Sequence, residues 1–330
     1  MSLASLAALE TGSAARAETV EDVRIKMGSR FEITVVADDA AEARSALEHA
    51  WEEIDRLEAM ISSWSESSET AEINRRAGER PVVVSPELFG LISRSLKVAE
   101  LTDGAFDPTF AALAGLWDFE ARAPSVPSAE AIRSAVDKVG YRRVKLDREA
   151  RTVYLAEPGV RLGFGAIGKG FAANSTVRVL RSLGIESGIV SAGGDLFAFG
   201  RREDGGPWRV GIADPQEEER TIAALLVSEQ AVVTSGDYES YFEIDGRRYS
   251  HILDPRTGWP VEEVRSATVV CADAELADAL ATAISVMGVE QGLRLIDRLQ
   301  GIEALMVDRE GRLHFSADFR SQLEPVKESE

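Results

Sequence analysis

The chain has 330 residues, 45% hydrophobic and 28% charged, which is typical of one large globular domain or two ordinary ones. Its net charge of -19 argues against nucleic acid or an anionic membrane as a main partner, because phosphate groups attract Lys and Arg. The only cysteine, Cys271, excludes a disulfide within the chain.

The first 20 residues are rich in Ala and Leu, and an Ala-Arg-Ala run at 15–17 resembles a signal-peptidase site. The segment lacks a basic residue near Met1, and Glu10 interrupts its apolar run. We therefore interpret residues 1–20 as a disordered tail or the remnant of a signal peptide. No later segment has the length of a membrane-spanning helix, so an integral membrane protein is not expected.

Helical patterns dominate the first part of the chain, up to about residue 125. The expected elements, in order, are a strand at 30–38, a long amphipathic helix at 40–63, a polar loop ending near Asn74, a helix at 86–101, a loop with helical pieces at 101–119, and a helix capped by Ser128.

Strands dominate from about residue 143. They are expected at 142–147, 152–157, 160–165, 188–200 around a glycine turn, 208–215, 221–229, 231–236, 240–255 with a turn at Asp245-Gly246, 266–273, and 304–318 with a turn at 309–311. Helices are expected at 166–183 and 274–288. This mixture predicts an α+β fold, and we treat residues 21–325 as a single domain.

The stretch GFGAIGKGF, residues 163–171, nearly matches a phosphate-binding P-loop. Free N–H groups where a helix begins bind anions, and Lys169 adds a positive charge. Gly170, however, stands where a P-loop has the hydroxyl that binds magnesium. The alternative is that Gly168 and Gly170 only allow close helix packing.

Asp278 and Thr282 lie four residues apart on an expected helix and so project from the same face. Carboxylate and hydroxyl oxygens suit a hard cation such as magnesium. The alternative is an exposed Asp beside a Thr that bonds back to its own helix.

His251 lies in a polar loop, SHILDPRTGWP, and is a candidate proton carrier near neutral pH. Its alternative role is to stabilise that turn. Asp107 follows Phe106 in a second loop, TDGAFDPTF, and two further glycine turns, SAGGD and TSGDY, end in Asp. Several such turns along one chain indicate one site built from loops.

Together these stretches resemble the ApbE-type flavin transferases over nearly the whole chain. The motifs that carry the resemblance are DGAFDPT, FGAIGKGFAAN, VSAGGD, WRVGIADP, TSGDY, SHILDPRTG and ADALAT, in that order. The resemblance implies mixed, mostly antiparallel sheets with packed helices, and an FAD site built from loops between the two parts. It also implies that Mg²⁺-dependent transfer of FMN from FAD to a Thr or Ser hydroxyl of a target protein releases AMP.

The resemblance assigns a role to each matching position. The metal site maps onto Ala166 through its carbonyl, Asp278 and Thr282. The FAD contacts map onto Met27, Trp64, Ala105, Phe106, Asp107, Lys169, Leu253 and Ala281. We assign proton handling to His251, with Asp254 or Asp237 in support. Two positions depart from the family pattern, because Gly163 replaces a common Asp and Trp64 replaces a common Tyr.

The resemblance also implies a partner and a location. Acceptors would carry a Ser/Thr-Gly-Ala-Thr-like motif, as membrane redox subunits do, and the protein would work in the periplasm or elsewhere outside the cytoplasm. Two alternatives stay open: an FAD pyrophosphatase that yields FMN and AMP, and an FAD-binding protein without catalysis. A P-loop NTPase fits less well because of Gly170.

Overall fold

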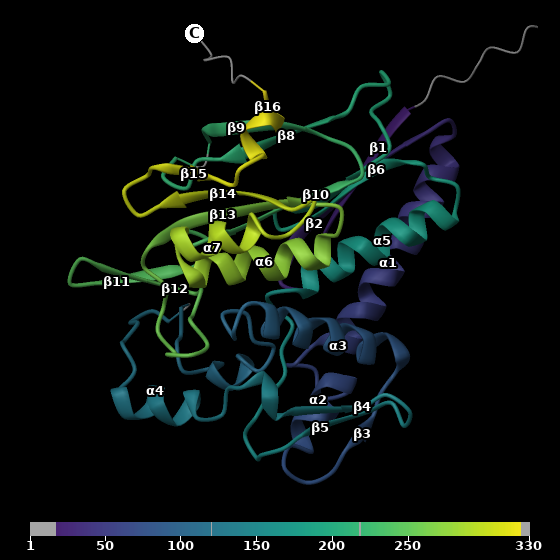
Figure 1. Cartoon of the computed structure of the whole chain (residues 1–330). Helices are drawn as coiled ribbons and strands as arrows, with labels where there is room; N and C mark the ends of the chain where they lie inside the picture. The colour runs from purple at the N-terminus through teal and green to yellow at the C-terminus, as the bar shows by residue number, and fades with distance from the viewer. Residues whose placement is uncertain (1–17, 120, 218, 325–330) are drawn as a thin grey trace, which may run out of the picture.

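A computed structural model describes residues 18–119, 121–217 and 219–324 (Figure 1). Strand β1 (Glu18–Lys26) begins at Glu18, so residues 18–20 belong to the folded body and the expected tail is too long at its end. The rest of that tail, residues 1–17, and residue 325 at the other expected boundary lie outside the described residues.

The centre of the molecule is an eight-stranded sheet in which every neighbouring pair is antiparallel. Its strands, in spatial order, are β1 (Glu18–Lys26), β2 (Ser29–Ala37), β6 (Ser187–Ala192), β7 (Asp195–Phe199), β10 (Gln230–Gly236), β13 (Val264–Cys271), β14 (Glu303–Asp308) and β15 (Leu313–Phe315). The expectation of an α+β fold with mostly antiparallel sheets is confirmed.

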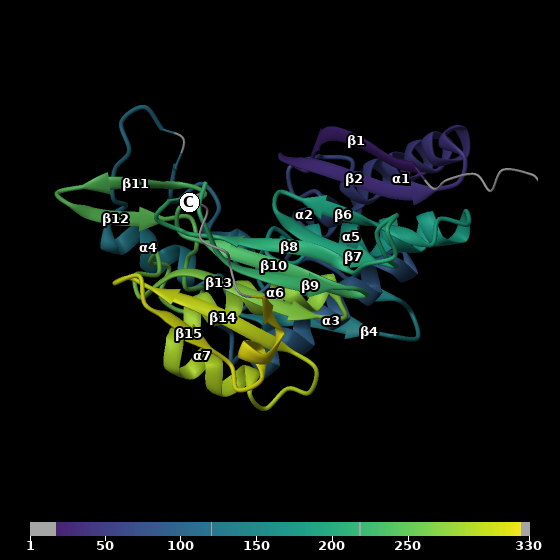
Figure 2. The same cartoon turned by 90° about the horizontal axis from the view of Figure 1, so that it is seen from above.

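Both faces of this sheet are covered, as strand β10 illustrates. Ala231 and Val233 pack into the core on one face, whereas Val232 packs into a second core on the other. Helices α1 (Ala40–Ile61), α5 (Gly168–Ser182) and α6 (Ala274–Met287) pack against the first face (Figures 1 and 2). A small sheet, β16 (Leu323–Glu324), β9 (Thr221–Val227) and β8 (Trp208–Ala213), covers the second.

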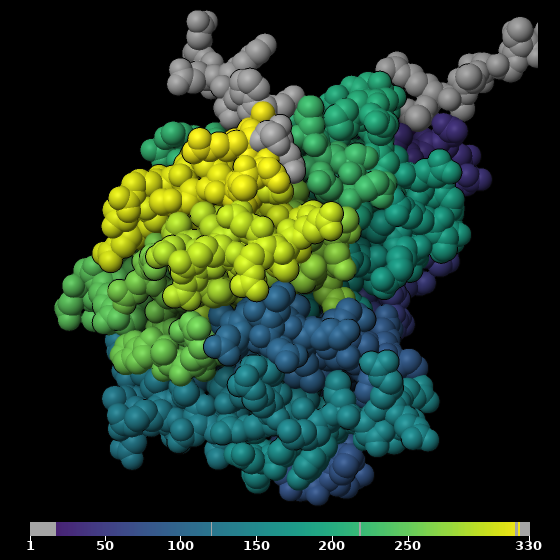
Figure 3. Space-filling model, viewed as in Figure 1, coloured from purple at the N-terminus to yellow at the C-terminus, as the bar shows by residue number. Residues whose placement is uncertain are grey.

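The segment between α1 and α5 forms a separate layer beneath α6, in blue and teal in Figure 3. It contains α2 (Glu69–Arg75), α3 (Pro86–Leu101), η1 (Ala111–Leu113), α4 (Ala129–Val136), η2 (Tyr141–Arg143) and the sheet of β3 (Val82–Val83), β5 (Thr152–Leu155) and β4 (Val144–Asp147). A bidentate ion pair between Arg94 of α3 and the buried Glu275 of α6 joins this layer to the rest.

The remaining described elements are the β11 (Tyr241–Ile244) and β12 (Arg247–Ser250) hairpin, α7 (Val289–Ile296) and η3 (Phe319–Gln322). The hairpin turns at Asp245-Gly246, both with positive φ, as expected. One buried cluster includes Phe31 near one end and Met306 near the other, which supports our proposal of a single domain.

The structure corrects the expected strand at 160–165. Only Arg161 forms an isolated bridge, to Phe110. The Asn74 side chain accepts from the Leu162 N–H at 2.7 Å and donates to its carbonyl at 2.9 Å. A side-chain amide thus satisfies the backbone groups that a neighbouring strand would need. Asn74 itself lies in α2, a helix capped by Ser68 where the sequence predicted a polar loop.

The N-termini of α5 and α6 meet and satisfy each other's free N–H groups. The Gly170 N–H in the first turn of α5 donates to Asp278 Oδ2 of α6 at 2.9 Å. In return, Asn174 of α5 accepts from the Ala274 N–H at 3.1 Å and donates to Asp273 at 2.8 Å. No side chain of its own caps α5. The contact therefore positions the glycine loop against α6.

This contact requires glycine at position 170. A Cβ there would lie 2.0 Å from the carbonyl oxygen of Ala274, which belongs to helix backbone that cannot move aside easily. We expect Gly170→Ala to lower the free energy of unfolding by about 3 kcal/mol or more, measured by urea denaturation.

Gly90→Ala is the matched control, because its new methyl group would meet only Arg94 Nη1, at 3.1 Å, and this nitrogen is not one of the two that bond Glu275. Alanine is a better helix former than glycine, so this variant should be as stable as the wild type or slightly more so. Equal stability of the Gly170→Ala variant and the wild type would contradict the packing argument.

Candidate functional site

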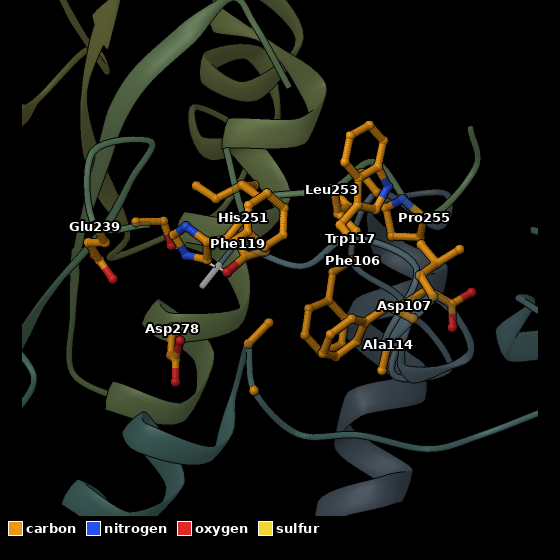
Figure 4. A pocket seen from close by; sticks show the side chains of 18 of the residues that line it. Phe106, Asp107, Ala114, Trp117, Phe119, Glu239, His251, Leu253, Pro255 and Asp278 are labelled. Carbon is orange, nitrogen blue, oxygen red and sulfur yellow. Dashed lines mark hydrogen bonds between the residues drawn. The ribbon is translucent and has the colours of Figure 1, made fainter. Parts of the chain in front are cut away.

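A cavity of about 320 Å³ lies between the lower layer and the α5–α6 contact. One end is apolar and aromatic, and the other carries charged and hydroxyl groups, as Figure 4 shows. Its lining residues are Ala105, Phe106, Asp107, Phe110, Leu113, Ala114, Gly115, Trp117, Phe119, Gly165, Ala166, Lys169, Thr234, Ser235, Glu239, His251, Ile252, Leu253, Pro255, Asp278 and Thr282. Such a division suits a ligand with a flat apolar part and a charged part.

Buried charges dominate the polar end. Lys169 forms an ion pair with Asp195, at 2.5 Å between Nζ and Oδ2, and Asp278 is 3% exposed. Burial and the Asp195 carboxylate raise the pKa of Asp278 well above its ordinary value, against the opposing charge of Lys169. Burial alone would lower the Lys169 pKa, but Asp195 and Asp278 outweigh it and raise that pKa. Here one ammonium group pairs with Asp195 and also feels the charge of the buried Asp278.

The oxygen donors beside Asp278 fit a magnesium ion. Asp278, Thr282 and Ala166 all line the cavity, and the Thr282 hydroxyl lies 3.3 Å from that of Ser235. In the described part of the chain no three His, Cys, Asp or Glu side chains form a metal-binding group. Carboxylate, hydroxyl and carbonyl oxygens nevertheless form a donor set typical of Mg²⁺, which would balance the surplus buried negative charge.

His251 faces the cavity with one ring nitrogen free for chemistry. Its Nδ1 lies 3.2 Å from the Ser240 carbonyl oxygen. A carbonyl only accepts, so Nδ1 carries the proton and the neutral ring presents the lone pair of Nε2. The ring is accessible from the cavity, yet the surrounding protein desolvates it and lowers its pKa. It is therefore neutral at pH 7 and able to accept a proton.

The aromatic end is held by a stack that the sequence analysis did not identify. Trp117 is buried, and its ring centroid lies 5.7 Å from that of Tyr249 and 5.6 Å from that of Trp259. Its Nε1 donates to the Gly258 carbonyl at 2.9 Å. Phe119 stacks on it at 6.3 Å. The β11–β12 hairpin thereby supports the apolar wall of the cavity from behind.

Asp107 lies on the apolar side, and its carboxylate is already engaged. Oδ1 accepts from the N–H and hydroxyl of Thr109, and Oδ2 accepts from the Tyr141 N–H. Burial raises its pKa, and these hydrogen bonds oppose that shift. In this structure the carboxylate holds two loops together at the cavity wall.

The structure brings most of the expected site residues to this one cavity. Those that line it are Ala105, Phe106, Asp107, Ala166, Lys169, His251, Leu253, Asp278 and Thr282. Those outside its lining are Met27, Trp64, Asp237, Asp254 and Ala281. Trp64 is 80% exposed, and Ala281 is fully buried in α6.

No carboxylate reaches His251 through a direct hydrogen bond among the described residues, although the charge of Asp237 acts to raise the His251 pKa against the larger effect of burial. Asp254 forms a bidentate pair with Arg256, and Asp237 pairs with Arg265 and Arg248. Within the described residues, neither hydrogen-bonds to His251, whose ring is oriented by a backbone carbonyl instead. Both carboxylates are held by neighbouring arginines, which are closer partners.

Several lining residues were given no role from the sequence. Those within stretches already singled out are Phe110, Gly165, Thr234, Ser235, Ile252 and Pro255, and the others are Leu113, Ala114, Gly115, Trp117, Phe119 and Glu239. For the second group except Glu239, the available signal was a run of apolar residues in a segment expected to be a loop, AALAGLWDF. Buried aromatic side chains in a loop need a partner surface, and here that surface is the hairpin.

Gly163 lies beside the cavity wall, where the resemblance leads us to expect a common Asp. A Cβ at this position would lie 2.8 Å from the Ala111 Cβ. The methyl group of Ala111 thus takes the space that a longer side chain would need. Glycine at position 163 therefore fits the close packing of this segment against Ala111.

Comparison with known families and proteins identifies the family of this chain. The model of the ApbE family matches residues 27–306. A FAD:protein FMN transferase of Treponema pallidum is 34% identical over 322 residues, covering 93% of this chain and 89% of the relative. A Vibrio cholerae protein of the same name is 33% identical, covering 93% and 92%.

Solved structures show the same fold. An ApbE protein from Thermotoga maritima superposes with a TM-score of 0.87 at 34% identity, over 93% of this chain and 100% of that one. The flavin transferase ApbE from Vibrio cholerae gives 0.84 at 29% identity, over 93% and 100%. These superpositions cover 93% of this chain and confirm the expected α+β fold class.

The aromatic stack should be essential for stability. Trp117→Ala would leave a cavity and an unpaired Gly258 carbonyl, so we expect a loss of about 3–5 kcal/mol in unfolding free energy, measured by urea denaturation. Trp64→Ala is the control, because an indole that is 80% exposed loses little packing, and its effect should stay within about 0.5 kcal/mol. Similar losses for both variants would refute this assignment.

Proposed function

This chain is a flavin transferase of the ApbE family, and we propose that it attaches the FMN half of FAD to a Thr or Ser hydroxyl of another protein and releases AMP. One observation supports this most directly: a single cavity holds an aromatic wall, a buried Lys-carboxylate group and a neutral histidine. These suit the flavin or adenine ring, the pyrophosphate and the acceptor proton, respectively.

The polar end would bind the pyrophosphate. We propose that Asp278, Thr282 and the Ala166 carbonyl hold Mg²⁺, which supplies positive charge to the phosphate oxygens during transfer. Lys169 adds a second positive charge at the same end of the cavity, and burial strengthens its effect. Positioning and charge neutralisation are the main requirements of phosphoryl transfer.

His251 would handle the acceptor proton. As the hydroxyl oxygen attacks the FMN phosphorus, its proton passes to Nε2, while Nδ1–H stays bonded to the Ser240 carbonyl. A phosphoester bond forms between the acceptor oxygen and the FMN phosphorus, and the bond from that phosphorus to the bridging oxygen breaks. AMP leaves with the bridging oxygen. Asp237 and Asp254 remain proposed supporting residues in this step, and the charge of Asp237 favours the protonated ring.

Met27 and Trp64 remain proposed FAD contacts, although they lie outside the cavity. FAD is too large to fit entirely within a cavity of about 320 Å³, so part of the molecule would extend beyond the lining residues. The exposed indole of Trp64 offers a flat face for a ring. Ala281 could contribute only through the packing of α6, since its side chain is fully buried.

The acceptor and the location of the protein belong to the same proposal. We propose an acceptor with a Ser/Thr-Gly-Ala-Thr-like motif, such as a membrane redox subunit, and action in the periplasm or elsewhere outside the cytoplasm. Among the described residues, no helix has the length and apolar character needed to span a membrane.

The first test is transfer to a model acceptor containing Ser-Gly-Ala-Thr, incubated with FAD, Mg²⁺ and the protein. We expect the acceptor to gain the mass of one FMN on Thr and AMP to appear in equal amount, both followed by mass spectrometry. AMP and free FMN without an adduct would indicate a pyrophosphatase instead. Asp278→Ala is the control and should release no AMP, because the metal carboxylate is absent.

His251→Ala should separate binding from chemistry. The ring donates only to a backbone carbonyl, so its removal should leave FAD affinity within about threefold, by flavin fluorescence, while transfer falls by about 10²–10⁴-fold. Ser240 contributes a backbone oxygen, so Ser240→Ala keeps the histidine in place and should transfer normally. Loss of FAD binding in His251→Ala would show instead that this ring positions the ligand.

A further inference from the structure

Asp195 is a buried carboxylate that the proposed chemistry does not use. It is the first residue of β7, directly after the Gly193-Gly194 turn, and it is 3% exposed. Its Oδ1 accepts from the Thr234 N–H at 3.0 Å, and its Oδ2 pairs with Lys169. It is not among the residues that line the cavity. Asp195 can therefore affect a bound ligand only through its contact with Lys169 or through the electric field of its own negative charge.

Lys169 pairs with one of the carboxylates whose charges act on it. Those charges are on Asp195, Asp278 and Glu239, and the ion pair is with Asp195. The Lys169 side chain is only 21% exposed, so a buried carboxylate is its natural partner. Without the charge of Asp195, the carboxylates left to attract the ammonium group would be Asp278 and Glu239, which line the same cavity as Lys169.

A pair between Lys169 and Asp278 would compete with a cation. One oxygen of Asp278, Oδ2, already accepts from the Gly170 N–H. The other oxygen is the one left for a metal ion, and an ammonium group bonded to it would exclude that ion. The position of the lysine thus decides whether the carboxylate is available.

We propose that Asp195 is a positioning residue that holds the Lys169 ammonium away from Asp278 and so keeps this carboxylate available to Mg²⁺. This inference rests on the proposed magnesium site and goes beyond it, because it gives a function to a residue that touches neither the metal nor the cavity. It also gives a reason for burying the Asp195 carboxylate behind the polar end of the cavity.

Asp195→Asn tests the charge without changing the shape. The amide oxygen can still accept from Thr234, but the ion pair with Lys169 is lost. We expect Mn²⁺ binding to the protein without FAD, followed by the electron paramagnetic resonance signal of the free ion, to weaken by about tenfold. The Mg²⁺ concentration for half-maximal AMP release should rise in parallel. Unchanged Mn²⁺ affinity would overturn the proposal.

The effect of Asp195→Asn in a Lys169→Met protein separates positioning from simple loss of negative charge. Without Lys169 no ammonium group remains to compete for Asp278, so the positioning role of Asp195 disappears. We therefore expect the double variant Lys169→Met, Asp195→Asn to bind Mn²⁺ within about threefold of Lys169→Met alone. If adding Asp195→Asn to Lys169→Met still weakens Mn²⁺ binding by about tenfold, Asp195 acts on the ion directly and the proposed role is wrong.

Asp308→Asn is the matched control. This carboxylate is equally buried and pairs with Arg312 and His314, but it lies at the end of β14 and does not line the cavity. Its Mn²⁺ affinity should equal that of the wild type, and urea denaturation should show every variant folded at the assay temperature. A wild-type protein that binds no Mn²⁺ would overturn the metal site itself, and with it the role of Asp195.

Discussion

Two helix N-termini that meet and cap one another hold this site together. Each begins with free N–H groups and a partial positive charge, so their meeting is unfavourable unless acceptors lie between them. Asp278 serves α5, and Asn174 with Asp273 serves α6. Gly170 makes the approach possible because it has no Cβ. The same contact leaves Lys169 in the first turn of α5 and Asp278 of α6 at the polar end of the cavity, where a pyrophosphate with its cation would lie.

The two ends of the cavity are built in different ways. The polar end rests on helices and on strands of the large sheet, which are fixed by cores on both sheet faces. The aromatic end rests on loops, and Trp117 is kept in place by the β11–β12 hairpin through a stack of rings. Phosphoryl transfer demands accurate placement of the phosphate, which a rigid support provides. A ring-binding wall needs only a flat apolar surface, which a stack of aromatic side chains supplies.

The sequence predicted most elements because their patterns are local. The helix at 40–61 and the turn at Asp245-Gly246 follow from amphipathic periodicity and from turn chemistry. The strand expected at 160–165 failed because the Asn74 side chain, 88 positions before Leu162, takes its backbone hydrogen bonds. A strand is defined by its partner, and no pattern within the segment shows that partner. The same reason explains why the aromatic wall was missed.

The sequence by itself determined the family, the α+β class and the types of groups available for chemistry, because motifs, periodicity and residue types are local properties of the chain. Only the tertiary structure decided which of those groups meet. Asp278, Lys169 and His251 reach one cavity, whereas Asp254 and Asp237 are held by arginines, and Asp195 reaches the site only through Lys169. Apart from the local pair of Asp254 with Arg256, these outcomes depend on contacts between residues distant in the chain, whose geometry is fixed only when the cores pack.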